Sequence, residues 1–257
     1  MLSLIAVERG VLDDIAAASR ILADQGVFDA AGHVSMRHPG HAERFLMARS
    51  LAPALVTADD IMEFTLDCEA CDARGRTAFI ERRLHGEIYR ARADVMAIAH
   101  GHCPSVIPFG LVATPMRATY HNAAFLAAGV PVFDIRATFG ATDIVINSAE
   151  RGAALAETLG DKSVVLLRAH GFAAVGPSLQ AAVFRAVFTE ISARVQLQAA
   201  VLGGPIAALD AEEGRMADAI NLATLGRSWE LWRRRVTEGK SKVKSQKSKV
   251  KSRKSDS

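Results

Sequence analysis

Three histidines are the residues of this chain best suited to chemistry, because they stand at the ends of apolar runs with the composition of β-strands. His100 and His102 follow the run 95–99, and His170 follows the run 164–168. Side chains alternate in an extended chain, so His100 and His102 share one face and can chelate one ion. A single histidine beside apolar residues is usually a core residue, but three neutral imidazoles at strand ends are typical of a metal site with room for a substrate. The spacing therefore indicates a metal centre.

The composition is that of a globular enzyme. Of the 257 residues, 50% are hydrophobic and 23% are charged, which is enough for one large core. No segment has the ~20 uninterrupted apolar residues that span a bilayer, and the N-terminus lacks the pattern of a signal peptide. The three cysteines, Cys68, Cys71 and Cys103, fit a reducing compartment better than a disulfide framework. We therefore expect a cytoplasmic protein that is not bound to a membrane.

The C-terminal residues 240–257 differ in charge from the rest of the chain. They contain eight Lys or Arg and one Asp, a charge of +7, which leaves −4 for residues 1–239 out of the total of +3. The sequence therefore predicts a mildly acidic folded domain over 1–239, which has no electrostatic reason to bind nucleic acid, and a disordered Lys/Ser-rich tail over 240–257. A solvated extension is the favoured interpretation of the tail, and an arm for RNA or anionic lipid is the alternative.

Helical and extended patterns alternate along 1–239, which indicates one α/β domain. The expected strands cover 32–37, 44–48, 95–99 and 164–168. The expected helices run from Leu12 to Gly26, from an N-cap at Thr57 through residue 64, from 81 to 92, from an N-cap at Asn147 to Gly160, from an N-cap at Ser178 to about Leu202, and near Trp229 and Trp232. The helix over 81–92 leads directly into the strand that carries His100.

Four motifs, in this order, resemble those of the class II aldolase/adducin family over roughly residues 8–205. They are Gly32-His33-Val34-Ser35, Glu81-Arg82-Arg83-Leu84-His85 with Tyr89 shortly after it, His100-Gly101-His102-Cys103-Pro104, and Leu167-Arg168-Ala169-His170-Gly171. The resemblance implies that His100, His102 and His170 are metal ligands. It also implies that Glu81 is the catalytic carboxylate. The implied fold is a three-layer αβα sandwich around a central, mostly antiparallel sheet, in a homotetramer with its active sites at subunit interfaces.

The chain departs from the sugar-phosphate aldolases of this family at the residues that hold the substrate phosphate. Those enzymes have an Asn in the first motif, a Thr/Ser-Gly turn in the second, and paired hydroxyl residues before the catalytic Glu. Here the corresponding residues are His33, Arg49-Ser50-Leu51 and Phe79-Ile80. A phosphate needs several N–H and O–H donors, and a Phe-Ile pair supplies no side-chain donor. We therefore expect a substrate that is not held through a phosphate.

The same stretches are similar to the decarboxylase branch of the family, whose members act on hydroxylated aromatic or pyridine carboxylates. In this interpretation Arg49 binds a carboxylate through its planar guanidinium. His33, Phe79 and His121 are expected to border the ring. The expected substrate-binding set is His33, Ser35, Arg49, Ser50 and Phe79.

Decarboxylation and retro-aldol cleavage each break a C–C bond and leave a carbanion, whose charge a divalent ion can store as an enolate or phenolate. We expect Mn²⁺ or Zn²⁺ as the cofactor and a small carboxylate as the substrate. Glu81 is the expected acid and base, with His85 and His121 as alternatives. The second hypothesis is an aldolase that cleaves an unphosphorylated hydroxy-keto acid or a sugar substrate. The third is a non-catalytic scaffold resembling adducin, against which the intact histidine triad argues.

Overall fold

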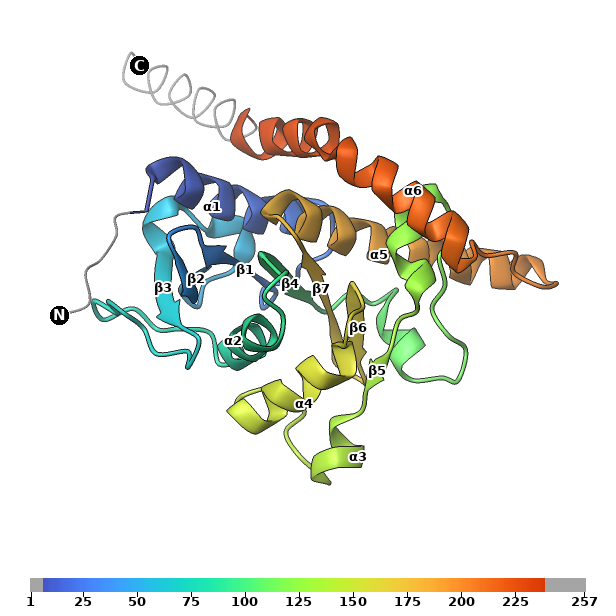
Figure 1. The fold of residues 1–257 in the computed structure, drawn as a ribbon, viewed down its shortest axis with the longest axis horizontal. Coiled ribbons are helices and arrows are strands. Elements are labelled where there is room, and N and C mark those ends of the chain that lie inside the picture. Colours follow the sequence, from blue (N-terminus) through green and yellow to red (C-terminus); the bar gives the residue numbers. More distant parts are fainter. Residues whose placement is uncertain (1–6, 239–257) are drawn as a thin grey trace, which may run out of the picture.

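The computed structural model describes residues 7–238, in which a seven-stranded sheet lies between two groups of helices (Figure 1). The strands are β1 (His33–His38), β2 (His41–Ala48), β3 (Ile61–Thr65), β4 (Ala97–Gly101), β5 (Val132–Phe133), β6 (Val164–Leu167) and β7 (Gly171–Gly176), in the order β3-β2-β1-β4-β7-β6-β5. Every neighbouring pair in this order is antiparallel except β5 and β6, which are parallel. The predicted three-layer sandwich with a mostly antiparallel sheet is therefore confirmed.

Helices cover both faces of the sheet. The α-helices are α1 (Arg9–Asp24), α2 (Arg82–Ala91), α3 (Ile135–Phe139), α4 (Ala149–Leu159), α5 (Leu179–Leu202) and α6 (Ala211–Ala223), followed by a helical segment over 225–238. Four short 3₁₀ segments are η1 (Pro53–Leu55), η2 (Ala58–Asp60), η3 (Ile107–Gly110) and η4 (His121–Ala128). Helices α1 and α5 pack together on one face, and α2 and α4 pack together on the other (Figure 1). Among the described helices, none is both long and apolar enough to cross a membrane.

The central strands contribute side chains to two separate cores. In β4, Ala97 and Ala99 belong to the core beneath α1 and α5, whereas Ile98 belongs to the core beneath α2 and α4. The strand is therefore apolar along its whole length, because both of its faces are buried. His100 stands two residues after Ile98, so its side chain lies on the α2 side of the sheet. Because of this alternation, His100 faces α2 and not α1 or α5.

Arg37 of β1 fixes the position of α2 against the sheet. Its Nη2 donates to the carbonyl oxygens of Tyr89 at 2.7 Å and Arg92 at 2.9 Å, at the end of α2. Its Nε donates to the carbonyl of Val95 at 3.1 Å, and its Nη1 donates to the carbonyl of Ala42 at 2.6 Å. The guanidinium also lies 4.8 Å from the centre of the Tyr89 ring.

Two local predictions differ from the structure, and several elements, α6 among them, were not predicted. The helix expected after Thr57 is only the 3₁₀ turn η2, and the following residues form β3, because pairing with β2 satisfies their backbone and buries both faces. The N-cap of α4 is Ser148, whose Oγ accepts from the N–H of Arg151, and not the neighbouring Asn147. Helix α6 was not predicted, although Asp210 and Glu213 form a capping box at its start.

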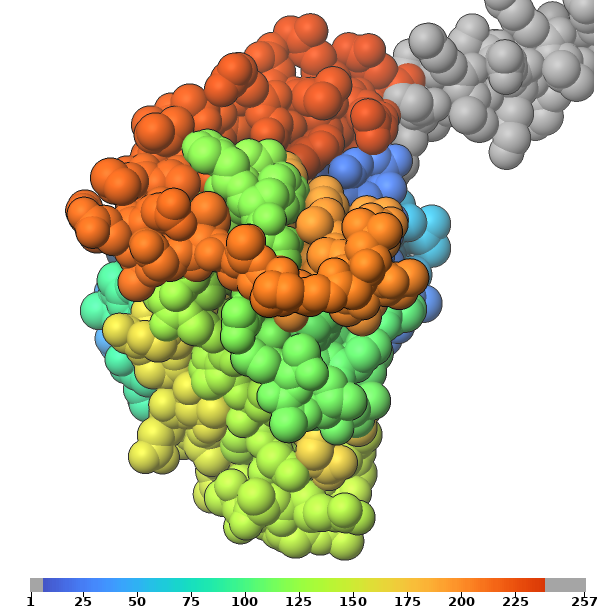
Figure 2. Space-filling model, turned by 90° about the vertical axis from the view of Figure 1, so that its right-hand side faces the viewer, coloured from blue at the N-terminus to red at the C-terminus, as the bar shows by residue number. Residues whose placement is uncertain are grey.

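The C-terminal helices form one end of the molecule. On the face seen in Figure 2, the chain from about residue 205 onward (orange to red) covers one end, and the region around 130–145 (yellow-green) occupies the opposite end. Helix α6 packs against η4, and Trp232 of the last helical segment is buried in the α1 and α5 core. The predicted helix near this tryptophan is confirmed. The predicted tail over 240–257 lies outside the described residues.

Candidate metal centre

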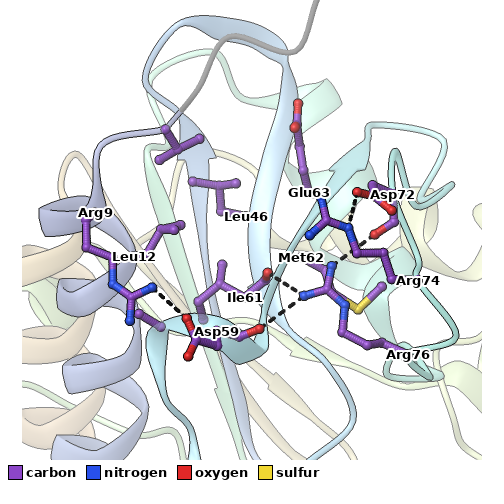
Figure 3. A pocket seen from close by; sticks show the side chains of 12 residues that line it. Arg9, Leu12, Leu46, Asp59, Ile61, Met62, Glu63, Asp72, Arg74 and Arg76 are labelled. Atoms are coloured by element: carbon purple, nitrogen blue, oxygen red, sulfur yellow. Dashed lines mark hydrogen bonds and ion pairs between the residues drawn. The ribbon is translucent and has the colours of Figure 1, made fainter.

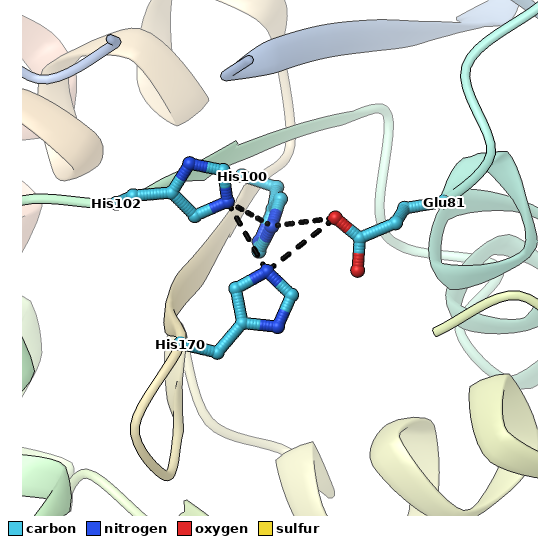
Figure 4. A group of neighbouring side chains, drawn as sticks. All are labelled: Glu81, His100, His102 and His170. Atoms are coloured by element: carbon cyan, nitrogen blue, oxygen red, sulfur yellow. Dashed lines mark hydrogen bonds and ion pairs between the residues drawn. The ribbon is translucent and has the colours of Figure 1, made fainter. Parts of the chain in front are cut away.

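Three imidazole nitrogens and one carboxylate oxygen converge at the end of β4 (Figure 4). The Nε2 of His102 lies 3.1 Å from the Nε2 of His100 and 3.2 Å from the Nε2 of His170. Oε2 of Glu81 lies 3.5 Å from the Nε2 of His100 and 3.4 Å from the Nε2 of His170. Four ligands at about 2.0–2.1 Å from a tetrahedral metal are themselves about 3.3–3.4 Å apart. The separations therefore fit a single divalent ion.

The β4–β7 pair brings the histidines together. His100 is in β4, His102 follows the strand directly, and His170 lies in the turn between β6 and β7. Antiparallel pairing of β4 with β7 places this turn beside the end of β4. A Cβ added to Gly171 would lie 2.2 Å from the carbonyl oxygen of Gly101, so only glycine allows the two backbones to approach this closely. The glycine that follows His170 is thus required for the geometry.

Glu81 reaches the same point from the opposite side, at the N-cap of α2. Its Oε1 accepts from the N–H of Ile146 at 3.0 Å, which leaves Oε2 aimed at the histidines. Burial alone would raise the pKa of Glu81, but hydrogen bonding and charge attraction from His100 and His170 outweigh burial and hold the pKa well below its usual range. Glu81 is therefore ionised and directed at the site.

Backbone carbonyls fix the ring orientation of two of the histidines. Nδ1 of His100 donates to the carbonyl of Phe172 at 3.0 Å, and Nδ1 of His170 donates to the carbonyl of Ile144 at 2.9 Å. A carbonyl oxygen only accepts, so each Nδ1 must carry the proton. In the neutral rings, both Nε2 atoms then present lone pairs to the site.

A carboxylate plays the same part for His102. Its Nδ1 lies 3.1 Å from Oδ2 and 3.2 Å from Oδ1 of Asp29, which also accepts from the N–H groups of Ala31 and Gly32. The Nε2 of His102 therefore also presents a lone pair when its ring is neutral. Three lone pairs and a carboxylate repel one another at these distances unless a proton or a metal ion lies among them. The donor set fits a divalent metal, and imidazole nitrogens are compatible with several such ions.

A hollow of about 510 Å³ opens next to Glu81. It is lined by Ala30, Ala31, His33, Ser50, Leu51, Ala52, Thr77, Ala78, Phe79, Ile80 and Glu81. The sequence-predicted residues His33, Ser50 and Phe79 thus come together beside the predicted carboxylate. The rings of His33 and Phe79 lie 4.7 Å apart between centroids, and most of the remaining wall is apolar.

Two other predicted residues lie beneath the hollow instead of lining it. Nε2 of His85 lies 2.8 Å from Nδ1 of His33, and Nδ1 of His85 lies 2.6 Å from Oγ of Ser35. The Oγ of Ser35 lies 2.8 Å from the hydroxyl of Tyr89. Burial, with a smaller contribution from the nearby His100, lowers the pKa of His85 to about 3. His85 is therefore a neutral, enclosed ring that connects buried groups.

Arg49 and His121 lie apart from this group. Nε of Arg49 donates to Oδ1 of Asp60 at 2.7 Å, and Arg49 is not among the residues that line the hollow. His121 begins η4 and lines a different hollow, together with Asn221 and Arg227. Within this chain, the structure does not bring either residue to the histidine cluster.

A further hollow of about 510 Å³ lies between α1, β3 and the loop around residues 72–76 (Figure 3). Its arginines already have partners. Arg9 donates to Asp59 at 2.6 Å, and Arg76 donates to the carbonyls of Asp59 and Ile61 at 3.2 and 3.0 Å. These arginines already bind a carboxylate or backbone carbonyls, so they are less available to a ligand than the side chains of the histidine site.

Asp29 and Tyr89 were not assigned roles from the sequence. For Tyr89 a signal existed, because it stands four residues after His85 and therefore on the same face of α2. For Asp29 no spacing rule exists, since its contact with His102 depends on how the loop before β1 folds over the end of β4.

Metal removal should destabilise this protein. At pH 8, a chelator should lower the Tm by roughly 10 °C, because the bound ion stabilises only the folded state. His102→Ala should abolish this response, and His121→Ala should retain it, as measured by thermal unfolding with and without added Zn²⁺ or Mn²⁺. An equal response in His102→Ala would exclude His102 as a ligand.

Loss of the Asp29 charge should weaken the metal site. Asp29→Asn keeps an acceptor for His102 but removes the negative charge that increases the basicity of its ring, so we expect metal affinity to fall about 10-fold to 100-fold. Competition with a chromophoric chelator measures this. The exposed Asp59, changed to Asn, is the matched control and should bind metal as the wild-type protein does. Unaltered affinity in Asp29→Asn would remove Asp29 from the site.

Known proteins resemble this chain over most of its length. A family model described as Class II Aldolase and Adducin N-terminal domain matches residues 13–197. The decarboxylase tropJ of Talaromyces stipitatus is 34% identical over 242 residues, covering 85% of this chain and 91% of the relative. The 3,4-dihydroxyphthalate decarboxylase of Arthrobacter keyseri is 30% identical over 239 residues, covering 87% of this chain and 92% of the relative.

A solved structure of an aldolase II superfamily protein from Pseudomonas syringae shares the fold, with a TM-score of 0.75 at 23% identity. The superposition covers 90% of this chain and 94% of that protein. The motifs, the fold and the matched family model agree with one another. The protein is therefore a member of the class II aldolase and adducin family, and it is a lyase.

Proposed function

We propose that this lyase is a metal-dependent decarboxylase of a hydroxylated aromatic or pyridine carboxylate. Two relatives that align over most of this chain are named decarboxylases, and the name of one specifies 3,4-dihydroxyphthalate, a hydroxylated aromatic acid. The observation that carries the proposal is the set of three imidazole lone pairs and one carboxylate beside a mostly apolar hollow. A flat ring suits such a wall, whereas a phosphate would find few donors there.

In this proposal His100, His102 and His170 hold Mn²⁺ or Zn²⁺, both of which accept imidazole ligands. A divalent ion bound there supplies a Lewis acid for the negative charge that develops as the C–C bond breaks. The chain supplies the orientation. His33 and Phe79 present aromatic surface to the ring of the substrate, and Ser50 contributes a hydroxyl to the lining of the same hollow.

Glu81 is the residue that would move the proton. Because its pKa is held low, it meets the substrate as a carboxylate. Glu81 then accepts the proton of the ring hydroxyl, the electrons of the breaking C–C bond stay on the ring as CO₂ leaves, and Glu81 returns the proton to the ring carbon. A proton from solvent restores the hydroxyl, so each turnover consumes one proton. His85 is too enclosed to replace Glu81 in this role.

We also infer a homo-oligomer, with a tetramer as the expected form and the site at a subunit interface. Ile80, at the rim of the hollow, is 61% exposed, and an apolar side chain in that position suits a site that a neighbouring subunit completes. His121 could contribute to catalysis only from such a neighbour, since within its own chain it lies in a separate hollow.

The direct test is to incubate the metal-loaded protein with a panel of substrates and to follow both CO₂ and aldehyde. The panel contains ortho-hydroxy aromatic and pyridine carboxylates, unphosphorylated hydroxy-keto acids and sugar phosphates. CO₂ release from a ring acid, lost after chelation, is the expected result. Aldehyde release from an aldol substrate would instead establish the aldolase alternative, and no turnover with any compound would favour a scaffold.

Glu81→Gln should reduce turnover by ~100-fold or more, because an amide cannot carry a proton between the hydroxyl and the ring carbon. Metal content should stay unchanged, since all three imidazoles remain. Glu87→Gln is the matched control on the same helix, because the Glu87 carboxylate faces Arg90 at 3.3 Å and lies outside the cluster. Wild-type turnover in Glu81→Gln would remove this residue from the mechanism.

A further inference from the structure

Four buried side chains form one hydrogen-bonded chain that starts at the hollow and ends inside the protein. They are His33, His85, Ser35 and Tyr89, with exposed fractions of 4%, 0%, 0% and 1%. Each neighbouring pair is joined at 2.6–2.8 Å. Within the described chain, no other side chain is hydrogen-bonded to the hydroxyl of Tyr89. The hydroxyl protons at the inner end must therefore find their acceptors within this chain.

Both imidazoles in the chain are neutral. Both rings are buried, with exposed fractions of 4% and 0%, and in the described part of the protein neither ring is hydrogen-bonded to a carboxylate that would stabilise a charged form. A neutral imidazole has one N–H donor and one acceptor nitrogen. Between His33 and His85, only one of the two facing nitrogens can therefore carry a proton.

The hydroxyl groups decide which nitrogen it is. If Tyr89 donates to Ser35 and Ser35 donates to Nδ1 of His85, then His85 carries its proton on Nε2 and donates it to Nδ1 of His33. Every proton between Tyr89 and His33 in this arrangement has an acceptor, and the remaining proton is on Nε2 of His33. If instead His33 donates to His85, then Nδ1 of His85 must donate to Ser35, and one of the two hydroxyl protons has no acceptor. A buried, unsatisfied O–H disfavours that arrangement by roughly tenfold or more.

We propose that this chain holds His33 in the tautomer that carries its proton on Nε2, so that His33 is a fixed, uncharged hydrogen-bond donor to an acceptor oxygen of the ligand. In the described structure, no protein group accepts from Nε2 of His33. This nitrogen is not among the buried side-chain atoms that lack a hydrogen-bond partner, so it is not sealed from the hollow. His33 also lines the hollow next to Glu81. Ser35, His85 and Tyr89 are positioning residues that act through His33.

This inference rests on the proposed function and specifies its substrate. The oxygen opposite His33 must be an acceptor, as in a carboxylate or a carbonyl, and a ligand with an N–H or O–H donor at that point would meet another donor. An uncharged donor orients a carboxylate without the strong stabilisation that a cation would give to the ground state. Such a group suits a carboxylate that loses its charge as CO₂ leaves.

The tautomer can be measured directly. We would label the ring nitrogens of all eight histidines with ¹⁵N, load the protein with Zn²⁺, and record magic-angle-spinning NMR spectra of the sedimented protein at pH 7. His33→Gln identifies the His33 signals by subtraction. The expected result is a protonated Nε2 and an unprotonated Nδ1. A protonated Nδ1, or protonation of both nitrogens, would overturn the proposal.

Two variants test whether the chain sets the tautomer. In Ser35→Ala, Nδ1 of His85 has no partner in either arrangement, so we expect His33 to show a mixture of both tautomers. In Tyr89→Phe, the hydroxyl of Ser35 still needs His85 as its acceptor, so His33 should keep its proton on Nε2. Circular dichroism and metal content show whether each variant is folded. An unchanged His33 spectrum in folded Ser35→Ala would contradict the positioning role.

Activity provides the second readout. With a ring acid that the wild-type protein decarboxylates, Ser35→Ala should lower kcat/KM by about tenfold without loss of metal, and Ser35→Thr, which keeps the hydroxyl, should restore it. Equal kcat/KM values in Ser35→Ala and the wild-type protein would contradict the inference. Absence of any decarboxylation by the wild-type protein would overturn the proposed function instead, and the NMR spectra alone would still decide the donor assignment.

Discussion

The structure depends on the convergence of three imidazole lone pairs and one carboxylate in a space that only a cation can make favourable. Two carbonyls and Asp29 accept the Nδ1 protons, so each Nε2 faces the others as a lone pair when its ring is neutral. The carboxylate of Glu81 adds negative charge at 3.4–3.5 Å from two of these nitrogens. Without a cation this arrangement is repulsive, and with one it becomes a preorganised site.

The sheet supplies the rigidity that such a site needs. Because helices cover both faces, β4 and β7 are held along their whole length, and Gly171 allows their ends to approach within contact distance. Helix α2 brings Glu81 from the opposite side, and its own position is fixed by the buried guanidinium of Arg37. Elements distant in sequence therefore place the carboxylate of Glu81 beside the three imidazoles.

In the proposed function, the wall beside the site selects the substrate. A C–C bond can be broken toward CO₂ or toward an aldehyde with the same electron sink, so the groups that hold the substrate decide the reaction. Here Phe79 and Ile80 make that wall apolar, and His33 replaces an amide with an imidazole whose proton position is set by buried hydroxyls. These groups support an aromatic acid with acceptor oxygens as the proposed ligand.

The sequence alone predicted the strand that leads to His100 and His102, the position of His170 after another strand, and the helix that begins at Glu81. Hydrophobic periodicity and short motifs are local properties, so these features can be recognised without the fold. The sequence also indicated the apolar wall through Phe79. Only the tertiary structure decided that Asp29 orients His102, that Arg49 is paired with Asp60, and that residues 61–65 pair as a strand. Each of these contacts joins residues from different elements of the fold. No periodicity or spacing within the sequence predicts which of these residues will lie side by side.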